Sequence, residues 1–175
     1  MNEWHRAVVE WRDFYTLIGT AGATLMGLTF VVITLSPKTI IDREDAVKSY
    51  TTPIMAFFTT IVVLSVFMLV PRLSSNLHAL AFAILGAVGI FYMCTTGTYQ
   101  SWKNSELGFD DLLWYVLWPF LAYVALLVAA LEIWRGNEIG LYIGGGASLF
   151  FLIIGIRNAW DVVLAVARIS AGGEP

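Results

Sequence analysis

The sequence predicts an all-α membrane protein, built as a bundle of five transmembrane helices behind an N-terminal amphipathic helical lead. Five apolar stretches are each about long enough to cross a bilayer, whose hydrocarbon core of ~30 Å needs about 20 helical residues. Hydrophobic residues make up 58% of the 175 residues and charged residues 13%, which is about half the ~25% charged share of soluble domains. The five spans are expected at residues 14–35, 53–70, 77–98, 112–131 and 140–160.

The connections between these spans are short. None exceeds about 17 residues, too few for a soluble domain, so residues 1–175 are expected to form a single integral membrane domain. Pro53 is expected to open the second span, at a position that a helix tolerates. The tight turn at residues 72–76 predicts an antiparallel hairpin of the second and third spans. Pro119 lies inside the fourth span and is expected to kink it.

Residues 2–13 form an amphipathic prelude to the first span. Trp4, Ala7 and Trp11 recur at helical spacing, with charged residues on the other side. This pattern is typical of a helix that lies in the headgroup region. An early, solvated start of the first span explains it equally well, so both alternatives stay open. The mixed charge of the segment is unlike that of a signal peptide, and we expect the segment to be retained.

The first span carries a seam of small residues. Gly19, Ala23 and Gly27 are four residues apart and fall within about 40° of one line on a helix. Such a seam lets two helix backbones approach closely. The partner helix belongs either to the same chain or to another copy. The opposite face is expected to meet lipid, and it consists of Ile18, Ala21, Leu25, Leu28 and Val32.

Three threonines lie on or beside this seam. Thr16 extends its face, while Thr20 and Thr24 flank it. Their hydroxyls are able to bond to a neighbouring helix. A threonine-lined path through the membrane is the functional alternative to packing.

The last span repeats the pattern. Gly140, Gly144, Ser148 and Gly155 share one face, which is expected to pack against another helix. A second side of the same helix is expected to face lipid. That side carries Tyr142, Leu149, Ile153, Ile156 and Trp160.

A polar stripe occupies the C-terminal half of the last span. Arg157 and Asp161 are four residues apart and are able to pair, with Asn158 between the two faces. If the helix crosses up to about residue 160, Arg157 lies near the interface and extends its charged end into water. If the helix sits deeper, the pair is intramembrane and marks a functional site. Both alternatives stay open.

The composition argues against several classes of function. The chain has one cysteine and two histidines, so an internal disulfide is excluded and no His/Cys metal cluster is expected. No nucleophile–base arrangement is evident, so we expect no enzyme activity and no cofactor. The sequence has no basic run of the kind that binds nucleic acid.

Two segments resemble a known group of proteins. The stretch Trp11-Arg12-Asp13-Phe14-Tyr15 is followed by the small-residue seam, and the chain closes on residues 155–161, Gly-Ile-Arg-Asn-Ala-Trp-Asp. Together they resemble a group of small bacterial multi-pass membrane proteins. The resemblance implies a bacterial inner-membrane setting and supplies no catalytic residues.

The distribution of cations predicts an orientation. Five spans place the two termini on opposite sides of the membrane. The C-terminal side holds six of the ten Lys and Arg residues, which leans toward a cytoplasmic C-terminus. The six are Lys38, Arg43, Lys48, Lys103, Arg157 and Arg168.

The sequence therefore favours a non-enzymatic membrane protein that acts as a homo-oligomeric pore or transport component. The small-residue seams would assemble copies around a path, and the lining candidates are Thr16, Thr20, Thr24, Arg157, Asn158 and Asp161. The alternative is an accessory or scaffold subunit that packs against another membrane complex. In both interpretations the working part is expected where the first and last helices pack.

Overall fold

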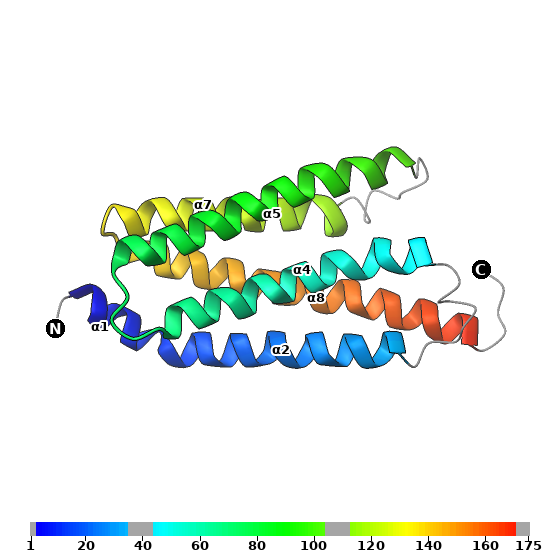
Figure 1. The fold of residues 1–175 in the computed structure, drawn as a ribbon, viewed down its shortest axis with the longest axis horizontal. Helices are drawn as coiled ribbons and strands as arrows, with labels where there is room; N and C mark the ends of the chain where they lie inside the picture. Colours follow the sequence, from blue (N-terminus) through cyan, green and yellow to red (C-terminus); the bar gives the residue numbers. More distant parts are fainter. Residues whose placement is uncertain (1–2, 35–43, 104–112, 171–175) are drawn as a thin grey trace.

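The chain forms a bundle of long helices that lie side by side (Figure 1). A computed structural model describes residues 3–34, 44–103 and 113–170. Across these described ranges the fold is all-α and contains no strand, so the predicted fold class is confirmed. The elements are α1 (Glu3–Glu10), α2 (Arg12–Thr34), α4 (Glu44–Leu69), α5 (Ser75–Lys103), the π-helical turn η1 (Leu113–Leu117), α7 (Trp118–Trp134) and α8 (Ile139–Ser170).

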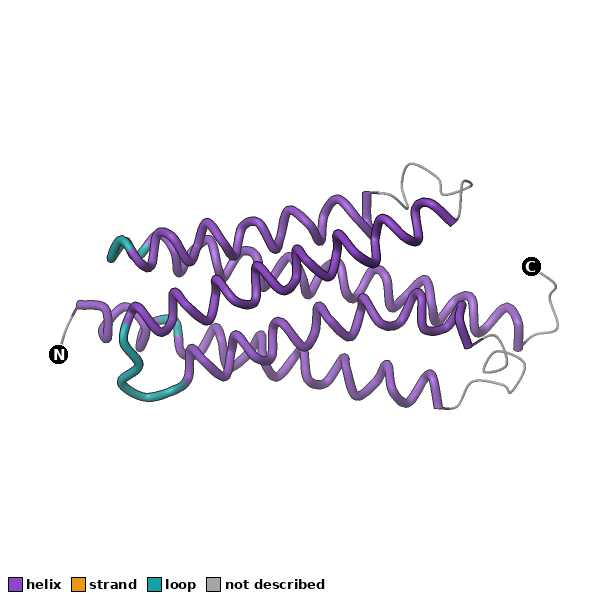
Figure 2. The backbone as a smooth tube through the Cα atoms, turned by 45° about the horizontal axis from the view of Figure 1, so that its top comes forward, coloured by secondary structure: helices purple, strands orange, loops and turns teal. Residues whose placement is uncertain are grey.

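Five of these helical segments are long and apolar enough to span a membrane. The chain is therefore an integral, multi-pass membrane protein in contact with a lipid bilayer. Successive spans alternate in direction, so α1 and the end of α8 lie at opposite ends of the bundle (Figures 1 and 2). The spans are Arg12–Thr34, Thr51–Leu69, Ser75–Thr95, Leu113–Trp134 and Ile139–Leu164.

Helix α8 occupies the middle of the bundle. It packs against α7, α4 and α2, whereas α5 packs mainly against α7 and α2 mainly against α4. Aromatic rings fill the centre: the ring of Phe151 on α8 lies 5.9 Å from Phe57 on α4 and 4.5 Å from Tyr123 on α7, measured between ring centroids. All three side chains are buried. The outer edges of the bundle are formed by α2 and α5.

Both short connections at one end of the bundle depend on a residue with positive φ. Arg72 has φ 59° in the turn that joins α4 to α5, and the two helices form the predicted antiparallel hairpin. Gly136 has φ 80° after α7 and donates its backbone N–H to the carbonyl oxygen of Ile133 at 3.0 Å. Glycine adopts this left-handed conformation without steric cost, so it closes the helix there.

Pro53 and Pro119 lie in different local settings. Pro53 does not open a helix: α4 begins earlier, at Glu44, and Pro53 lies inside it. A proline inside a helix removes one backbone hydrogen bond, and here that loss falls close to the polar end of the span. In the fourth span the irregularity lies just ahead of Pro119, as the π-helical turn η1, because its ring crowds the preceding turn.

The lead is a helix in its own right. A single residue, Trp11, separates α1 from α2. Trp4 and Ala7 of α1 are buried. The Trp4 indole N–H lies 3.4 Å from Nδ1 of His78 at the start of α5, with the two rings edge to face. The structure therefore favours the distinct amphipathic helix over a simple early start of the first span.

Candidate functional site

A polar cluster lies where the C-terminal half of α8 meets η1. Arg157 pairs with Asp161 one turn later on α8. The guanidinium carbon of Arg157 lies 5.7 Å from the ring centroid of Trp114, within the range of a cation–π contact. The Tyr115 hydroxyl donates to Asp161 Oδ2 at 3.5 Å. We call these four residues the Arg157 cluster.

The π-helical turn explains how neighbouring aromatic residues reach the same helix. Pro119 disfavours regular α-helix in the turn before it, and the chain there forms η1. Trp114 and Tyr115 are consecutive in this turn, and each contacts one member of the ion pair on α8. The two aromatic residues escaped the sequence analysis as partners of Arg157. Their only signal is an aromatic pair four to five residues ahead of a proline within a span.

The Arg157 cluster lies at one end of a span. The fourth span runs from Leu113 to Trp134, 22 residues, or about 33 Å of helix. Trp114 belongs to its first turn, and Arg157 lies against that ring. The side chains of Arg157 and Asp161 are 42% and 35% exposed. The span of α8 itself runs to Leu164, three residues beyond Asp161, so the interfacial and the intramembrane alternatives both stay open.

Asn158 points to the interior instead. Its side chain is 0% exposed, and neither its amide nitrogen nor its amide oxygen has a hydrogen-bond partner among the described residues. A buried polar group without a partner costs about 1 to 3 kcal/mol. Asn158 is thus separated from Arg157 and Asp161 although it lies between them in sequence.

The three candidate threonines lie on the outside of α2. Thr16, Thr20 and Thr24 are all exposed. Each hydroxyl donates to the backbone carbonyl oxygen four residues earlier, at 2.7 to 2.9 Å. Their donors are therefore used within the helix, while their oxygens can still accept. The structure does not bring these threonines into contact with the Arg157 cluster.

The seam of α2 packs inside the chain only at Gly19. A Cβ built on Gly19 would lie 2.7 Å from Cβ of Ser65 on α4. Ala23 and Gly27 are exposed, and a Cβ on Gly27 would meet nothing within 4 Å. Gly22 also faces α4, about 140° around the helix from Gly27, and a Cβ built on it would lie 3.3 Å from the Ile61 side chain.

One part of the predicted lipid face of α2 is therefore wrong. Ile18 is only 4% exposed and belongs to the buried face, which also carries Tyr15, Gly22 and Thr29. The reason is that Gly22, one helical turn after Ile18, lets α4 approach on that side. A seam of small residues and an aliphatic face can each pack against a neighbouring helix. Helical spacing alone therefore does not show which of the two faces is buried in the bundle.

The seam of α8 lies inside the bundle and meets three different helices. Gly140 approaches the backbone of Ala129 on α7, Gly144 contacts Phe82 on α5, and Gly155 contacts Phe58 on α4. Ser148 is also buried and donates to the carbonyl oxygen of Gly144. The side expected to face lipid is exposed at Tyr142, Leu149, Ile153, Ile156 and Trp160.

The first and last helices meet through aromatic residues, not through their two seams. A Cβ on Gly145 of α8 would lie 2.6 Å from the Trp11 ring and 3.3 Å from Phe14. Both aromatic residues stand near the start of α2, in the other half of the bundle from the Arg157 cluster. This contact is separate from the polar stripe of α8, and the expectation that the working part lies where the two helices pack stays a prediction.

Comparison with known proteins adds no family. Neither the protein-family models nor the curated proteins nor the solved structures contain a match to this chain. The resemblance to small bacterial membrane proteins therefore stays a prediction. Among the described residues no group of three or more His, Cys, Asp or Glu side chains could hold a metal, and the expected lack of a cofactor also stays a prediction.

Proposed function

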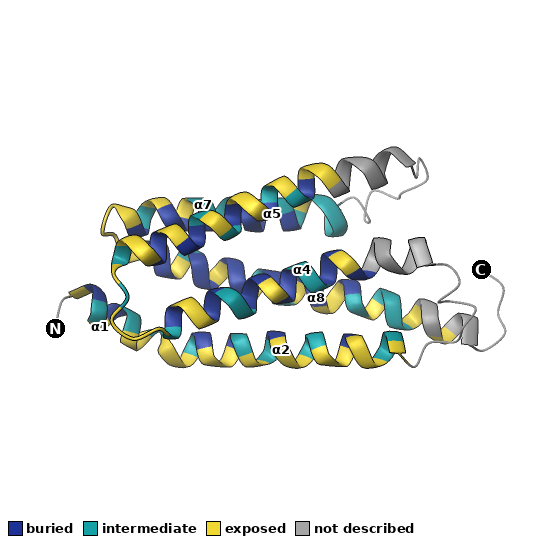
Figure 3. Cartoon of the chain, viewed as in Figure 1, coloured by how far each residue is buried: buried dark blue, intermediate teal, exposed yellow. Residues whose placement is uncertain are grey.

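We propose that this protein is a non-enzymatic membrane protein whose copies assemble through the outer face of α2 and form a pore or transport component. The observation that carries this proposal is the exposure of α2. Only 17% of its most apolar stretch is buried in the single chain, against 39% to 50% in the other four spans (Figure 3). We call Thr16, Thr20, Ala23, Thr24 and Gly27 the α2 outer face.

The chemistry of the α2 outer face suits another helix. Small side chains let two backbones approach closely, and van der Waals packing then drives association in a bilayer that offers no hydrophobic gain. Gly27 leaves open space where a partner backbone would fit. The threonine oxygens retain acceptor capacity toward a partner helix, water or a cation.

A path between copies is favoured over a path inside one chain. The centre of the single bundle is filled by the packed rings of Phe57, Tyr123 and Phe151. Polar oxygens in line along the membrane occur instead on the α2 outer face, at Thr16, Thr20 and Thr24. Copies that meet near this face would bring several such lines together around a shared axis.

The first experiment measures the oligomeric state in detergent by size-exclusion chromatography with light scattering. We expect a discrete homo-oligomer for the unchanged protein and a smaller species for Gly27→Leu. Gly146→Leu is the matched control, because Gly146 also has nothing within 4 Å of a built Cβ but lies on α8. A monomeric unchanged protein, or an equal shift in both variants, would contradict assembly through α2.

The second experiment measures ion flux in liposomes. Thr20→Val removes the hydroxyl at nearly constant volume, and we expect it to reduce flux because the oxygen is lost from the path. Arg157→Ala tests whether the Arg157 cluster also contributes to flux. A discrete oligomer without flux would instead favour the alternative function, an accessory or scaffold subunit that uses the same face to hold another membrane protein.

We also propose a bacterial inner membrane as the location, with the C-terminus in the cytoplasm. The support is the resemblance of the first and last spans and the excess of cations on the C-terminal side. Two of those cations, Lys38 and Arg43, lie outside the described residues. A reporter fused after residue 175 tests the orientation, and periplasmic activity would contradict it.

A further inference from the structure

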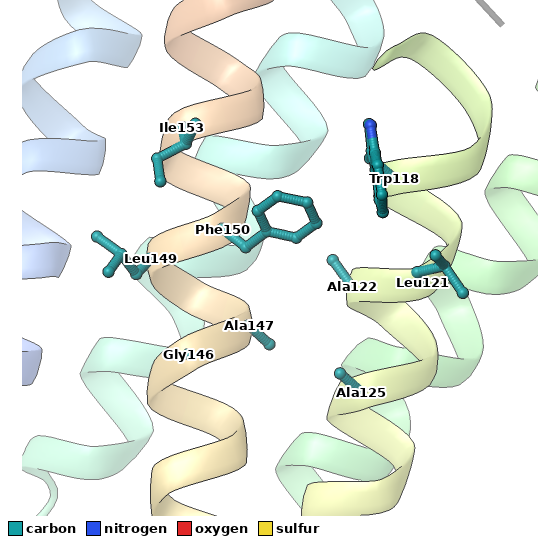
Figure 4. A pocket seen from close by; sticks show the side chains of 9 residues that line it. All are labelled: Trp118, Leu121, Ala122, Ala125, Gly146, Ala147, Leu149, Phe150 and Ile153. Carbon is teal, nitrogen blue, oxygen red and sulfur yellow. The ribbon is translucent and has the colours of Figure 1, made fainter. Parts of the chain in front are cut away.

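An apolar groove runs along the outside of the bundle between α7 and α8 (Figure 4). Its volume is about 420 Å³. Small residues on both helices leave the hollow, and the side chains of Phe150 and Trp118 border it, 5.7 Å apart between ring centroids. The lining residues are Trp118, Leu121, Ala122, Ala125, Gly146, Ala147, Leu149, Phe150 and Ile153.

The groove leads to the Arg157 cluster. Arg157 lies one helical turn beyond Ile153 on α8. Trp114, in η1, lies one turn before Trp118, the first residue of α7. Arg157 and Trp114 contact each other one turn beyond that end of the groove. Gly146 and Arg157 are eleven residues apart, about 16 Å along the helix axis. This length is about half the ~30 Å hydrocarbon core, which is the depth of one leaflet.

The charges at the mouth of the groove form a balanced pair. Arg157 and Asp161 are both partly exposed, so each has capacity for a further partner. Arginine is the residue that recognises phosphate by paired hydrogen bonds. Asp161 offers a carboxylate to a cation, whereas an anionic group without a cation would be repelled by it. A ligand that carries one phosphate and one ammonium group satisfies both.

We propose that the groove and the Arg157 cluster bind one phosphatidylethanolamine molecule of the bilayer. An acyl chain lies in the groove between α7 and α8, the phosphate contacts Arg157, and the ammonium group contacts Asp161. The apolar lining matches hydrocarbon, and the distance from groove to cluster matches one leaflet. The site lies on α7 and α8, so it is independent of assembly through the α2 outer face.

A second groove supplies an internal control. It lies between α5 and α7, has a volume of about 560 Å³ and is lined mostly by apolar residues. Its lining, like that of the first groove, contains no charged residue, and consists of Asn76, Leu77, Ala79, Leu80, Ala83, Leu127, Ala130, Leu131 and Trp134. If volume and apolarity alone held lipid, this groove would retain lipid as well as the first.

The experiment titrates the delipidated, detergent-purified protein with phosphatidylethanolamine or phosphatidylglycerol of identical acyl chains and counts bound lipids by native mass spectrometry. We expect one tightly held phosphatidylethanolamine per chain and at least tenfold weaker binding of phosphatidylglycerol. Arg157→Gln is expected to weaken phosphatidylethanolamine binding at least tenfold. Gly146→Leu is expected to do the same, because the leucine side chain fills the hollow.

Two kinds of control separate the site from general effects. Gly27→Leu on α2 and Ala83→Leu in the second groove are expected to retain the lipid. Asp161→Asn is expected to remove the preference for phosphatidylethanolamine over phosphatidylglycerol, because the ammonium group loses its partner while the phosphate keeps Arg157. This loss of preference is a readout that a merely structural role of Asp161 would not produce.

Three outcomes would overturn the proposal. They are equal binding of the two lipids by the unchanged protein, full retention by Arg157→Gln, and loss of the oligomer without loss of lipid in Gly146→Leu. The last outcome would assign the groove to a protein contact. A monomeric unchanged protein that still holds phosphatidylethanolamine would contradict the proposed assembly and leave the lipid site standing.

Discussion

Helices α2 and α8 carry the same small-residue spacing and use it in opposite ways. In α8 the seam is buried, and Gly140, Gly144 and Gly155 each meet a different helix. In α2 the seam faces outward from Ala23 onward, and Gly27 meets nothing within the chain. The difference teaches that small-residue spacing identifies a helix face that another helix can approach closely. It does not identify whether that other helix belongs to the same chain.

The positions of the two helices in the bundle account for this difference. α8 has neighbours on three sides, so almost any small residue on it faces another helix of the same chain. α2 stands at the edge and rests mainly on α4. Because one face is enough for that contact, the remaining faces of α2 are left for lipid or for another protein.

The largest effect is expected from Gly140→Ala. Its Cβ would lie 2.7 Å from the carbonyl oxygen of Ala129 and 2.9 Å from the backbone nitrogen of Ile133, and backbone atoms of a packed helix cannot move aside cheaply. We expect the free energy of unfolding to fall by about 3 kcal/mol, measured by thermal unfolding in detergent. Gly146→Ala, the exposed glycine of the same helix, is expected to stabilise the protein slightly through better helix propensity. Equal stability of the two variants would contradict the contrast between the packed Gly140 and the exposed Gly146.

Asn158→Leu is expected to have the next largest effect, with the opposite sign. It replaces a buried amide that has no partner among the described residues by an apolar group of similar size. We expect the free energy of unfolding to rise by about 2 kcal/mol. Asn158→Asp is the control, because a buried charge should lower stability. If Asn158→Leu destabilises the protein, the amide has a partner that stabilises the fold.

Trp4→Phe is expected to loosen the contact between α1 and α5. The substitution keeps an aromatic ring but removes the indole N–H that points to His78. The expected cost is about 1 kcal/mol, read out as faster backbone hydrogen exchange in α1 with no change in the spans. Trp160→Phe, at a site that is 60% exposed, should leave exchange unaltered. Unchanged exchange in both variants would mean that α1 is held by ring packing alone.

The smallest effect on stability is expected from Asp161→Asn. The Arg157–Asp161 pair is partly exposed, and such pairs contribute about 0.5 kcal/mol. Glu132→Gln, which breaks the partly exposed pair with Arg135, should show a similar small change in thermal unfolding. A loss of several kcal/mol in Asp161→Asn alone would favour the intramembrane alternative for the Arg157 cluster.

Particular residues show how far sequence reasoning reached. The run of apolar residues around Phe57 and Phe151 identified those two spans because helices in a bilayer must be long and apolar. The pairing of Arg157 with Asp161 followed from their i,i+4 spacing. The contacts of this pair with Trp114 and Tyr115 did not follow, because residues more than forty positions apart meet only after α7 and α8 pack.

Sequence alone was enough to establish the number of spans, the alternation of their direction and the faces on which small residues gather. These properties are local, since hydrogen bonding within each helix and the thickness of the bilayer dictate them. Only the tertiary structure decided that the seam of α8 is internal, that Gly27 is exposed and that Asn158 is buried apart from its polar neighbours. These properties depend on which helix occupies the centre, and an apolar helix packs against protein or lipid with nearly equal hydrophobic gain.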